Sequence, residues 1–483
     1  MIFWRVKPLD EILATAEKRS LKRQLGALQL TLLGIGAIIG TGIFVLTAVA
    51  ANKAGPGMMW AFVIAAGVCA LTALIYAEIA SMVPVAGSAY TYSYAVLGEF
   101  IAWMVGWALV LEYAVAACAV AVGWSGYVNG LLREAGMPLP LFLTAGPRDT
   151  ITLADGTTAA GGFNLLAFVI SLVITWLLVI GTSKSAKVNA VLVAIKIAAL
   201  TMFVILAIPA VQSSNFQPMF PNGWGSPLGG GGVGVLGAAA SIFFAYVGFD
   251  AVSTAAEETK NPNRNIPIGL IGSLAVCTVF YLLVAYAATG AVGAQPGGAL
   301  SMSKEPLAFV LREIGWPKAG NLIGLAAGLA LPSVILMMIY GQTRIFFTMA
   351  RDGLLPEAFA KVHPRYHTPH VVTIVTGIAV SLFAAMFPVA LLADVSNTGT
   401  LFAFFVVALG VMVLRVKDPS RKRPFRTPFI WVVGPLAMVG CAVLFFSLDI
   451  ISKTWFVVWA AIGLVVYFGY SMSRSALARP ASA

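Results

Sequence analysis

Twelve apolar stretches, separated by short polar segments, dominate the pattern along the chain. A window of about 19–20 residues, the length that crosses a bilayer as a helix, locates all of them. Their approximate limits are 28–51, 58–83, 99–130, 163–181, 188–210, 233–257, 266–292, 321–350, 370–390, 395–414, 428–448 and 454–473. The pattern predicts an all-α integral membrane protein with twelve transmembrane helices. A cytoplasmic N-terminal segment (1–27) and tail (474–483) flank this single domain of residues 28–473.

The order of the stretches suggests two equivalent halves. Five helices at about 28–210 would form the first half and five at about 233–414 the second, with two extra helices at about 428–473. The loops between them are too short for separate domains.

Glycine interrupts two of the stretches near their middles, at 34–44 and at 241–250. A spanning helix must satisfy its backbone polar groups internally, so a break there implies that the chain faces something other than lipid. Paired breaks at corresponding positions of two halves indicate a transporter's binding site. The alternative is that Gly36 and Gly40 only let helices pack closely.

Broken helices expose unpaired backbone groups. At the first break the N–H groups of Thr41, Gly42 and Ile43 would face a carboxylate, because a helix N-terminus attracts anions. At the second break the carbonyls of Phe244, Ala245 and Val247 would face an ammonium group. The two breaks together predict a receptor for a zwitterion such as an α-amino acid.

Composition agrees with a membrane protein. Hydrophobic residues make up 60% of the chain and charged residues 10%, with a mean hydropathy of +0.92. A soluble domain usually carries about 25% charged residues. All four cysteines lie within the apolar stretches, so a disulfide framework is not expected.

Lysine and arginine predict the orientation. With the N-terminus in the cytoplasm, basic residues of the inner segments outnumber those of the outer segments by roughly three to one. Both termini are therefore expected in the cytoplasm, with the protein in the plasma membrane (the inner membrane of a bacterial cell). The net charge of +11 follows from this asymmetry and from anionic lipid at the inner leaflet, and does not indicate a nucleic-acid partner.

Lys196 lies deep in the fifth stretch, about 13 Å beyond Lys187 along the helix axis. Because a charged side chain is costly at that depth, its presence there indicates a functional role. Desolvation favours the neutral amine, so Lys196 could gain and lose a proton near neutral pH. The alternatives are a lysine that snorkels to the inner surface and one held in a static pair.

Two carboxylates also lie within stretches. Glu112, in the third, could face a cationic substrate side chain or take part in proton movement, or it could lock helices together through hydrogen bonds. Asp250, just after the second break, could cap the resumed helix or couple motion to binding.

The motifs at both breaks resemble a known family. Gly-Ala-Ile-Ile-Gly-Thr-Gly-Ile-Phe at 36–44 is similar to the first-helix motif of the amino acid–polyamine–organocation (APC) transporters. Phe-Phe-Ala-Tyr-Val-Gly-Phe-Asp at 243–250 is similar to the sixth-helix motif of its cationic amino acid transporter branch. The segments 340–344 and 351–356 match as well.

The resemblance implies a leucine-transporter-like fold with a five-plus-five inverted repeat, discontinuous first and sixth helices, and alternating access. It implies that Ile38, Thr41 and Gly42 hold the substrate carboxylate while Phe244, Ala245 and Val247 hold its amine. Lys196 would replace the sodium ion that bridges the first and eighth helices in sodium-driven relatives. Leu331 would line the side-chain pocket, where an apolar residue favours a small or neutral side chain.

Other chemistry is poorly supported. His363, His367 and His370 lie in a proline-containing inner loop without a carboxylate or cysteine partner, so no metal site is expected. No nucleophile or acid–base pair near one face suggests an enzyme, no cofactor is implied, and neither a charged ring nor a carbonyl filter motif suggests a channel.

The sequence thus predicts proton-coupled uptake of L-amino acids, with no obligatory protein partner. The alternatives are an obligate amino acid exchanger, in which Lys196 stays charged, and a nutrient sensor that binds substrate without moving it.

Overall fold

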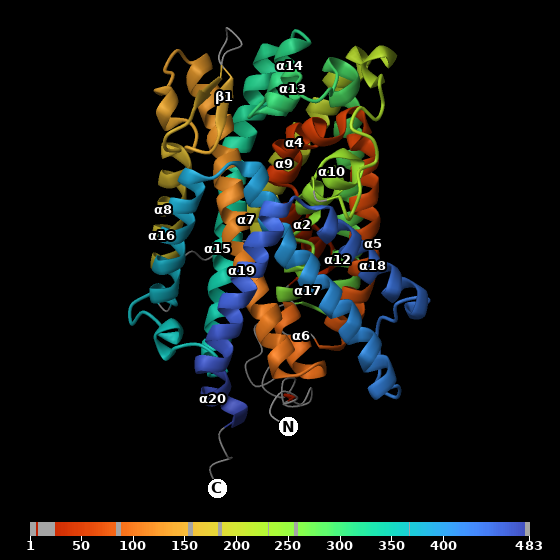
Figure 1. Cartoon of the computed structure of the whole chain (residues 1–483), viewed down its shortest axis with the longest axis vertical. Coiled ribbons are helices and arrows are strands. Elements are labelled where there is room, and N and C mark those ends of the chain that lie inside the picture. Colours follow the sequence, from red (N-terminus) through yellow and green to blue (C-terminus); the bar gives the residue numbers. More distant parts are fainter. Residues whose placement is uncertain are drawn as a thin grey trace.

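The structure is a computed structural model that describes residues 6–7, 25–83, 88–152, 158–181, 186–229, 231–255, 259–366 and 368–478. Its helices stand side by side in one bundle (Figure 1). Most of the segment 1–27, together with His367 and residues 479–483, lies outside the described residues.

The principal helices and strands of the described residues follow one another along the chain. They are α2 (Ala27–Ile38), α3 (Thr41–Phe44), α4 (Leu46–Ala54), α5 (Met58–Met82), α6 (Ser88–Val96), α7 (Glu99–Glu134), β1 (Thr150–Thr152), β2 (Thr158–Ala160), α8 (Leu165–Ile180), α9 (Ala186–Ala207), α10 (Gly234–Ile242), α11 (Ala251–Thr254), α12 (Pro262–Val292), α13 (Ala299–Met302), α14 (Pro306–Glu313), α15 (Pro317–Arg351), α16 (His370–Met386), α17 (Val389–Lys417), α18 (Ile430–Ser447), α19 (Ile450–Val466) and α20 (Met472–Arg474).

The length and apolar character of these helices make the chain a multi-pass membrane protein. Among the described residues, eight helical segments are long and apolar enough to cross a membrane. Four further apolar helices are shorter: Ala27–Ile38, Leu165–Ile180, Gly234–Tyr246 and His370–Met386. The predicted stretches 28–51 and 233–257 differ most from the structure, because each is divided into shorter helices at a break.

Helix ends are set by local sequence signals. Asn164 accepts a hydrogen bond from the backbone N–H of Ala167 at the start of α8, and Asp449 accepts one from Ser452 at the start of α19. Proline occupies the first turn of α12 and α15, where a missing N–H costs nothing. Gly293, at φ 77°, ends α12 in a conformation that favours glycine.

The helix α7 lies at the centre of the bundle and α19 at its edge. Within their most apolar windows, 89% of the α7 residues are buried, against 17% of those in the segment Ile450–Arg474 that contains α19. Small residues let α7 approach its neighbours: a Cβ on Gly341 of α15 would lie 3.0 Å from the Tyr113 ring, and one on Gly399 of α17 would lie 2.6 Å from the Ala108 carbonyl oxygen.

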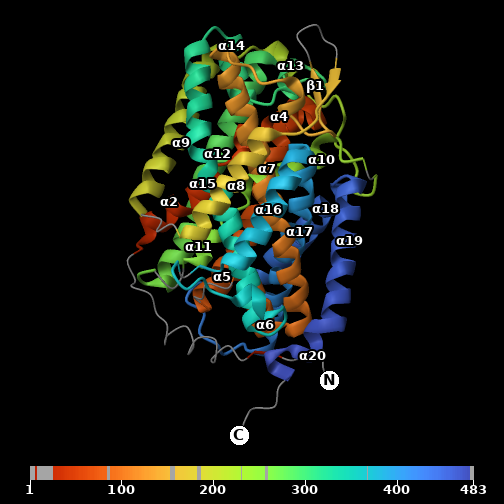
Figure 2. The ribbon, with the colours of Figure 1, turned by 90° about the vertical axis from the view of Figure 1, so that its left-hand side faces the viewer.

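Within the part of the chain that the structure describes, a two-stranded antiparallel hairpin departs from the all-α prediction. Thr150 pairs with Ala160 and Thr152 with Thr158. The hairpin lies in the loop between α7 and α8, at the end of the bundle opposite α20 (Figure 2). It pairs locally because backbone outside a helix needs partners.

Both ends of the described chain attach to the same residue. Lys7 donates from Nζ to the Asp352 carboxylate at 3.1 Å, and the N–H of Ala476 donates to the Asp352 carbonyl at 2.9 Å. Asp352 ends α15, so residues near both termini lie at one end of the bundle.

Candidate functional site

The first apolar stretch breaks at Ile39 and Gly40. The helix α2 ends at Ile38, and Ile39 (φ −70°, ψ 99°) and Gly40 (φ −150°, ψ −148°) are extended before α3 begins at Thr41. The predicted interruption of this stretch is therefore present in the structure.

The second break lies between α10 and α11. The helix α10 continues as one turn of 3₁₀ helix over Phe243–Tyr246, after which Val247 is extended. Gly248 follows at φ 118°, a conformation that residues with a Cβ rarely adopt. A Cβ on Gly248 would also lie 2.9 Å from the carbonyl oxygen of Ala37, so glycine here allows the two broken segments to meet.

The two breaks touch directly at Gly42 and Ala245. A Cβ on Gly42 would overlap with the backbone and Cβ of Ala245. Only glycine at position 42 permits this approach. The contact brings the start of α3 beside the 3₁₀ turn, although the two segments lie about two hundred residues apart.

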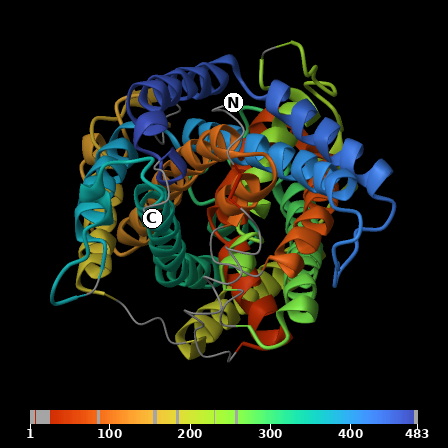
Figure 3. The same ribbon diagram turned by 90° about the horizontal axis from the view of Figure 1, so that it is seen from below.

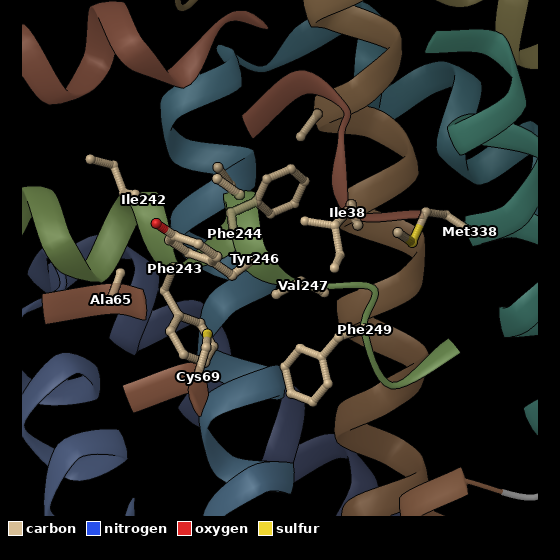
Figure 4. Packing of buried hydrophobic residues seen from close by; sticks show 14 of the residues in the cluster. Ile38, Ala65, Cys69, Ile242, Phe243, Phe244, Tyr246, Val247, Phe249 and Met338 are labelled. Carbon is tan, nitrogen blue, oxygen red and sulfur yellow. The ribbon is translucent and has the colours of Figure 1, made fainter. Parts of the chain in front are cut away.

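A small cavity lies where the breaks meet. Figure 4 shows Ile38 facing Phe244 and Val247, with Met338 on its other side. The residues that line the cavity come from both breaks and from two other helices: Ala37, Ile38, Gly40, Thr41, Gly42, Val120, Phe244, Val247, Val334 and Met338. Thr41, Ile38 and Phe244 are almost wholly buried, so the cavity lies in the interior of the bundle.

Unpaired polar groups lie at the start of α3, where Thr41 and Gly42 line this cavity. None of the N–H groups of Thr41, Gly42 and Ile43 donates to a backbone carbonyl of the described residues. The Thr41 hydroxyl, in a side chain that is 1% exposed, has no hydrogen-bond partner within that part of the chain either. A buried polar group without a partner costs free energy. Grouped at the start of a helix, these donors suit an anion.

Tyr281 of α12 links the carbonyls of the two breaks. Its hydroxyl lies 2.9 Å from the Ile38 carbonyl oxygen and 2.9 Å from the Ala245 carbonyl oxygen. One hydroxyl has one proton to donate, so it serves the two acceptors in alternation or as a shared bond. Tyr281 therefore joins α2 to the segment after α10 at the level of the cavity.

Lys196 of α9 donates from Nζ to the carbonyl oxygen of Gly36 at 2.7 Å. Gly36 lies in the last turn of α2, where carbonyls lack intrahelical partners. Lys196 is 1% exposed, so the alternative that it snorkels to the inner surface is wrong. The ammonium group instead stabilises the end of the first half-helix, next to the break.

Glu112 and Asp250 lie away from the cavity. Glu112 faces α17, where Ser396 donates to its backbone carbonyl at 3.0 Å and Gly399 leaves room for its Cβ. Asp250 makes no capping bond to α11, so that alternative is wrong. Its carboxylate accepts a hydrogen bond from Tyr113, the residue after Glu112, at 3.2 Å.

Comparison with known proteins decides the family. The sequence profile described as amino acid permease matches residues 25–469. The chain belongs to the amino acid permease family. This places it in the APC superfamily and confirms the resemblance.

Among relatives, the permease is 45% identical to the branched-chain amino acid permease BcaP of Bacillus subtilis, over 99% of each chain. It is 43% identical to the methylthioribose transporter of the same organism, over 98% of this chain and 99% of that one. It is 35% identical to the chloroplastic cationic amino acid transporter 9 of Arabidopsis thaliana, over 87% of this chain and 71% of that one. All three are named as carriers of amino acids or other small organic solutes.

Five of the nine predicted substrate residues line the cavity of the permease: Ile38, Thr41, Gly42, Phe244 and Val247. The others do not. Ile43 and Ala245 lie beside it in the backbone, Leu331 is one turn of α15 away from Val334, and Glu112 is about 12 Å along α7 from Val120.

Sequence reasoning did not assign Ala37 and Gly40 of the first break to the substrate, and it missed Val120, Val334 and Met338 of the two other helices. Val334 and Met338 occur three and seven residues after Leu331, on one face of α15, so helical periodicity from Leu331 could have indicated them. Nothing in the local sequence distinguishes Val120 from its apolar neighbours.

A metal centre finds no support within the described part of the chain, where no group of three histidine, cysteine, aspartate or glutamate side chains comes together. His363 accepts hydrogen bonds at Nδ1 from the backbone N–H groups of Arg365 and Tyr366, at 3.1 and 3.3 Å. This nitrogen is therefore occupied as an acceptor and supports the loop.

Proposed function

We propose that the permease is a secondary active transporter that binds an L-amino acid where its two broken helices meet. The observation that carries this proposal is the group of unpaired donors at Thr41, Gly42 and Ile43, of which Thr41 and Gly42 line a cavity between the breaks. The substrate carboxylate would accept from these N–H groups and from the Thr41 hydroxyl. Electrostatic attraction at the start of the resumed helix adds to these hydrogen bonds.

The substrate amine would bind at the second break. Val247 and Phe244 lie against the cavity, after the last regular turn of α10. The expected free carbonyl at Phe244 is not free, because it accepts from the N–H of Val247 at 3.3 Å, so only its second lone pair would serve the amine. The Ala245 carbonyl already accepts from Tyr281, and its second lone pair is left for the ammonium group. The amine would therefore bind beside a backbone carbonyl that the hydrogen bond from Tyr281 keeps in place.

The side chain of the substrate would lie among apolar groups. Val120, Val334 and Met338 line the cavity, while Glu112 lies elsewhere. A cationic side chain would find no carboxylate partner among these lining residues and would lose its hydration. We therefore propose a neutral, aliphatic amino acid as the substrate.

Proton coupling would act through Lys196. The protonated amine holds the Gly36 carbonyl at the end of α2, and loss of its proton weakens this charge-assisted bond. The first half-helix is then released to move. Alternating access in a twelve-helix, five-plus-five arrangement would follow, with α3–α4 and α10 shifting against the rest of the bundle. The basic inner segments favour cytoplasmic termini in the inner membrane.

Uptake into liposomes tests the proposal. Purified permease is reconstituted at equal internal and external pH, and again with an acidic exterior, and labelled leucine uptake is compared. Proton symport predicts faster uptake and accumulation in the acidic case, abolished by a protonophore. Uptake that is insensitive to the gradient but requires internal amino acid would identify an exchanger instead.

Ligand identity needs a separate measurement. The thermal stability of the purified permease is measured with each of the twenty amino acids and with methylthioribose, because a ligand that binds the folded state raises stability. Stabilisation by leucine, isoleucine or valine supports a zwitterion site. Stabilisation by methylthioribose alone would contradict it. Binding without any uptake would favour a sensor.

A further inference from the structure

A rigid basic surface lies between α17 and α18, at the same end of the bundle as Asp352. It is built on the end of α17 and the segment 418–429, and presents three exposed cations, Lys417, Lys422 and Arg426. Figure 3 shows this segment at the periphery of the bundle, beside the ends of α17 and α18. We call these three residues the inner basic surface.

Buried Glu78 holds the segment in place. Its carboxylate, which is fully buried at the end of α5, pairs with Arg415 at 2.6 Å and with Arg423 at 3.3 Å. It also accepts from the backbone N–H of Thr427 at 2.8 Å. The N–H of Phe425 donates to Ser81 of the same helix. These bonds fix the loop to α5, so the inner basic surface is preorganised.

The three cations of the surface are available to a partner. Glu78 is already shared by two arginines, and Asp418 accepts from Arg421 at 3.5 Å. Among the residues that the structure describes, no carboxylate pairs with Lys417, Lys422 or Arg426. The surface therefore keeps an excess of positive charge that attracts a phosphate or another anion.

Two exposed aromatic residues, Phe429 and Trp431, follow Arg426 closely along the chain. Phe429 is 84% exposed and Trp431 58% exposed. Phe429 adopts φ 45°, a conformation that is unfavourable for a bulky residue and usually accompanies a functional constraint. Aromatic rings beside basic groups are typical of the level where lipid headgroups meet the hydrocarbon.

The helix that follows shows where the hydrocarbon begins. Along α18, Val432, Leu436 and Val439 are all more than half exposed, as expected of side chains that contact lipid tails. Phe429 precedes this helix and Trp431 lies in its first turn, so the basic surface lies just outside the apolar layer. A lipid whose tails contact α18 would place its phosphate beside Lys422 and Arg426.

We propose that the inner basic surface binds the phosphate of an anionic phospholipid, such as phosphatidylglycerol, while Phe429 and Trp431 pack against its glycerol and upper acyl chains. The proposal depends on charge and shape at this surface and is independent of the transported substrate. The positive potential needed for it falls off within a Debye length, so only lipid directly at the surface contributes.

Native mass spectrometry of the full-length permease in detergent tests the proposal, with phosphatidylglycerol or phosphatidylcholine of equal chain length added. The wild type should retain phosphatidylglycerol in preference to phosphatidylcholine. The triple variant K417Q/K422Q/R426Q should lose this preference by about tenfold or more. A matched control, R351Q/K361Q/R365Q, removes the same charge from other exposed inner positions and should keep it.

A second variant separates lipid recognition from folding. Phe429→Gly relieves the unfavourable backbone conformation, so the protein should remain folded, yet its phosphatidylglycerol retention should fall.

Equal loss in the control triple variant would overturn the proposal, because the effect would then reflect overall charge. Displacement of the lipid by millimolar inorganic phosphate would also overturn it, because the surface would then be a site for a free anion.

Discussion

The ammonium group of Lys196 donates to the carbonyl oxygen of Gly36, 2.7 Å away, at the end of the first half-helix. This bond connects α9 to the residue four positions before Gly40, where the helix breaks. The side chain proposed to carry the proton thus contacts the half-helix that the proposed alternating access would move.

Lys196→Met should uncouple transport from the proton gradient. We expect uptake of a labelled amino acid in liposomes to lose its stimulation by an acidic exterior, because the variant has no proton to exchange at Gly36. The unpaired Gly36 carbonyl should also cost about 1–3 kcal/mol of stability. Lys196→Arg keeps a fixed charge and serves as the control for a static role. Gradient-driven uptake in Lys196→Met would contradict the coupling.

Gly42→Ala should abolish substrate binding. Its added methyl group would overlap with Ala245, so the two breaks must separate and the unpaired donors must shift. Thermal-shift measurements should show loss of stabilisation by substrate. Gly67→Ala, in α5, is the matched control, because nothing lies within 4 Å of the added Cβ. If Gly42→Ala still binds substrate, the contact between Gly42 and Ala245 is not required for the site.

Tyr281→Phe should weaken both binding and stability. The hydroxyl that bridges the Ile38 and Ala245 carbonyls is lost, which leaves buried acceptors unsatisfied at a cost of about 1–3 kcal/mol. Calorimetry of the purified protein measures the substrate dissociation constant and the unfolding midpoint. Tyr286→Phe, on the same helix but with an exposed ring, should change neither. Equal effects in the two variants would argue against a bridging role.

Met338→Ser should change substrate preference more than Leu331→Ser. Met338 lines the cavity, so a smaller side chain removes apolar contact with an aliphatic substrate and should lower its affinity by roughly tenfold or more. Leu331 lies a turn away from Val334 and should have little effect. Competition for leucine uptake by the other amino acids gives the profile. A larger change in Leu331→Ser than in Met338→Ser would indicate that Leu331 lines the substrate pocket.

Asp394→Ala should destabilise the packing of α17 against α4 and α10. Asp394, in a side chain that is 2% exposed, pairs with Lys53 at 2.7 Å and accepts from Ser241, and so joins α17 to α4 and α10. Removing one partner of a buried ion pair costs about 3–5 kcal/mol. Asp149→Ala, which breaks the more exposed pair with Lys304, should cost far less. Similar unfolding midpoints for the two variants would refute this role.

The sequence by itself determined the membrane class and the location of both breaks. The length of an apolar stretch and a glycine in its middle are local features of the chain. They can therefore be recognised from the sequence without coordinates. The breaks at Gly40 and Gly248 lie where glycine interrupts the pattern. The depth of Lys196 within a stretch was also expected, but the sequence left open whether its ammonium group snorkels to the surface, and only the structure shows it buried.

Only the tertiary structure decided which side chains meet at the breaks. Lipid tails and the protein interior are both apolar, so hydropathy does not tell which face of a membrane helix turns inward. For that reason Glu112 was predicted at the substrate and lies against α17, while Val120 and Met338 were missed. The partners of the free carbonyls, Tyr281 and Lys196, come from helices that only packing brings to Ile38 and Gly36.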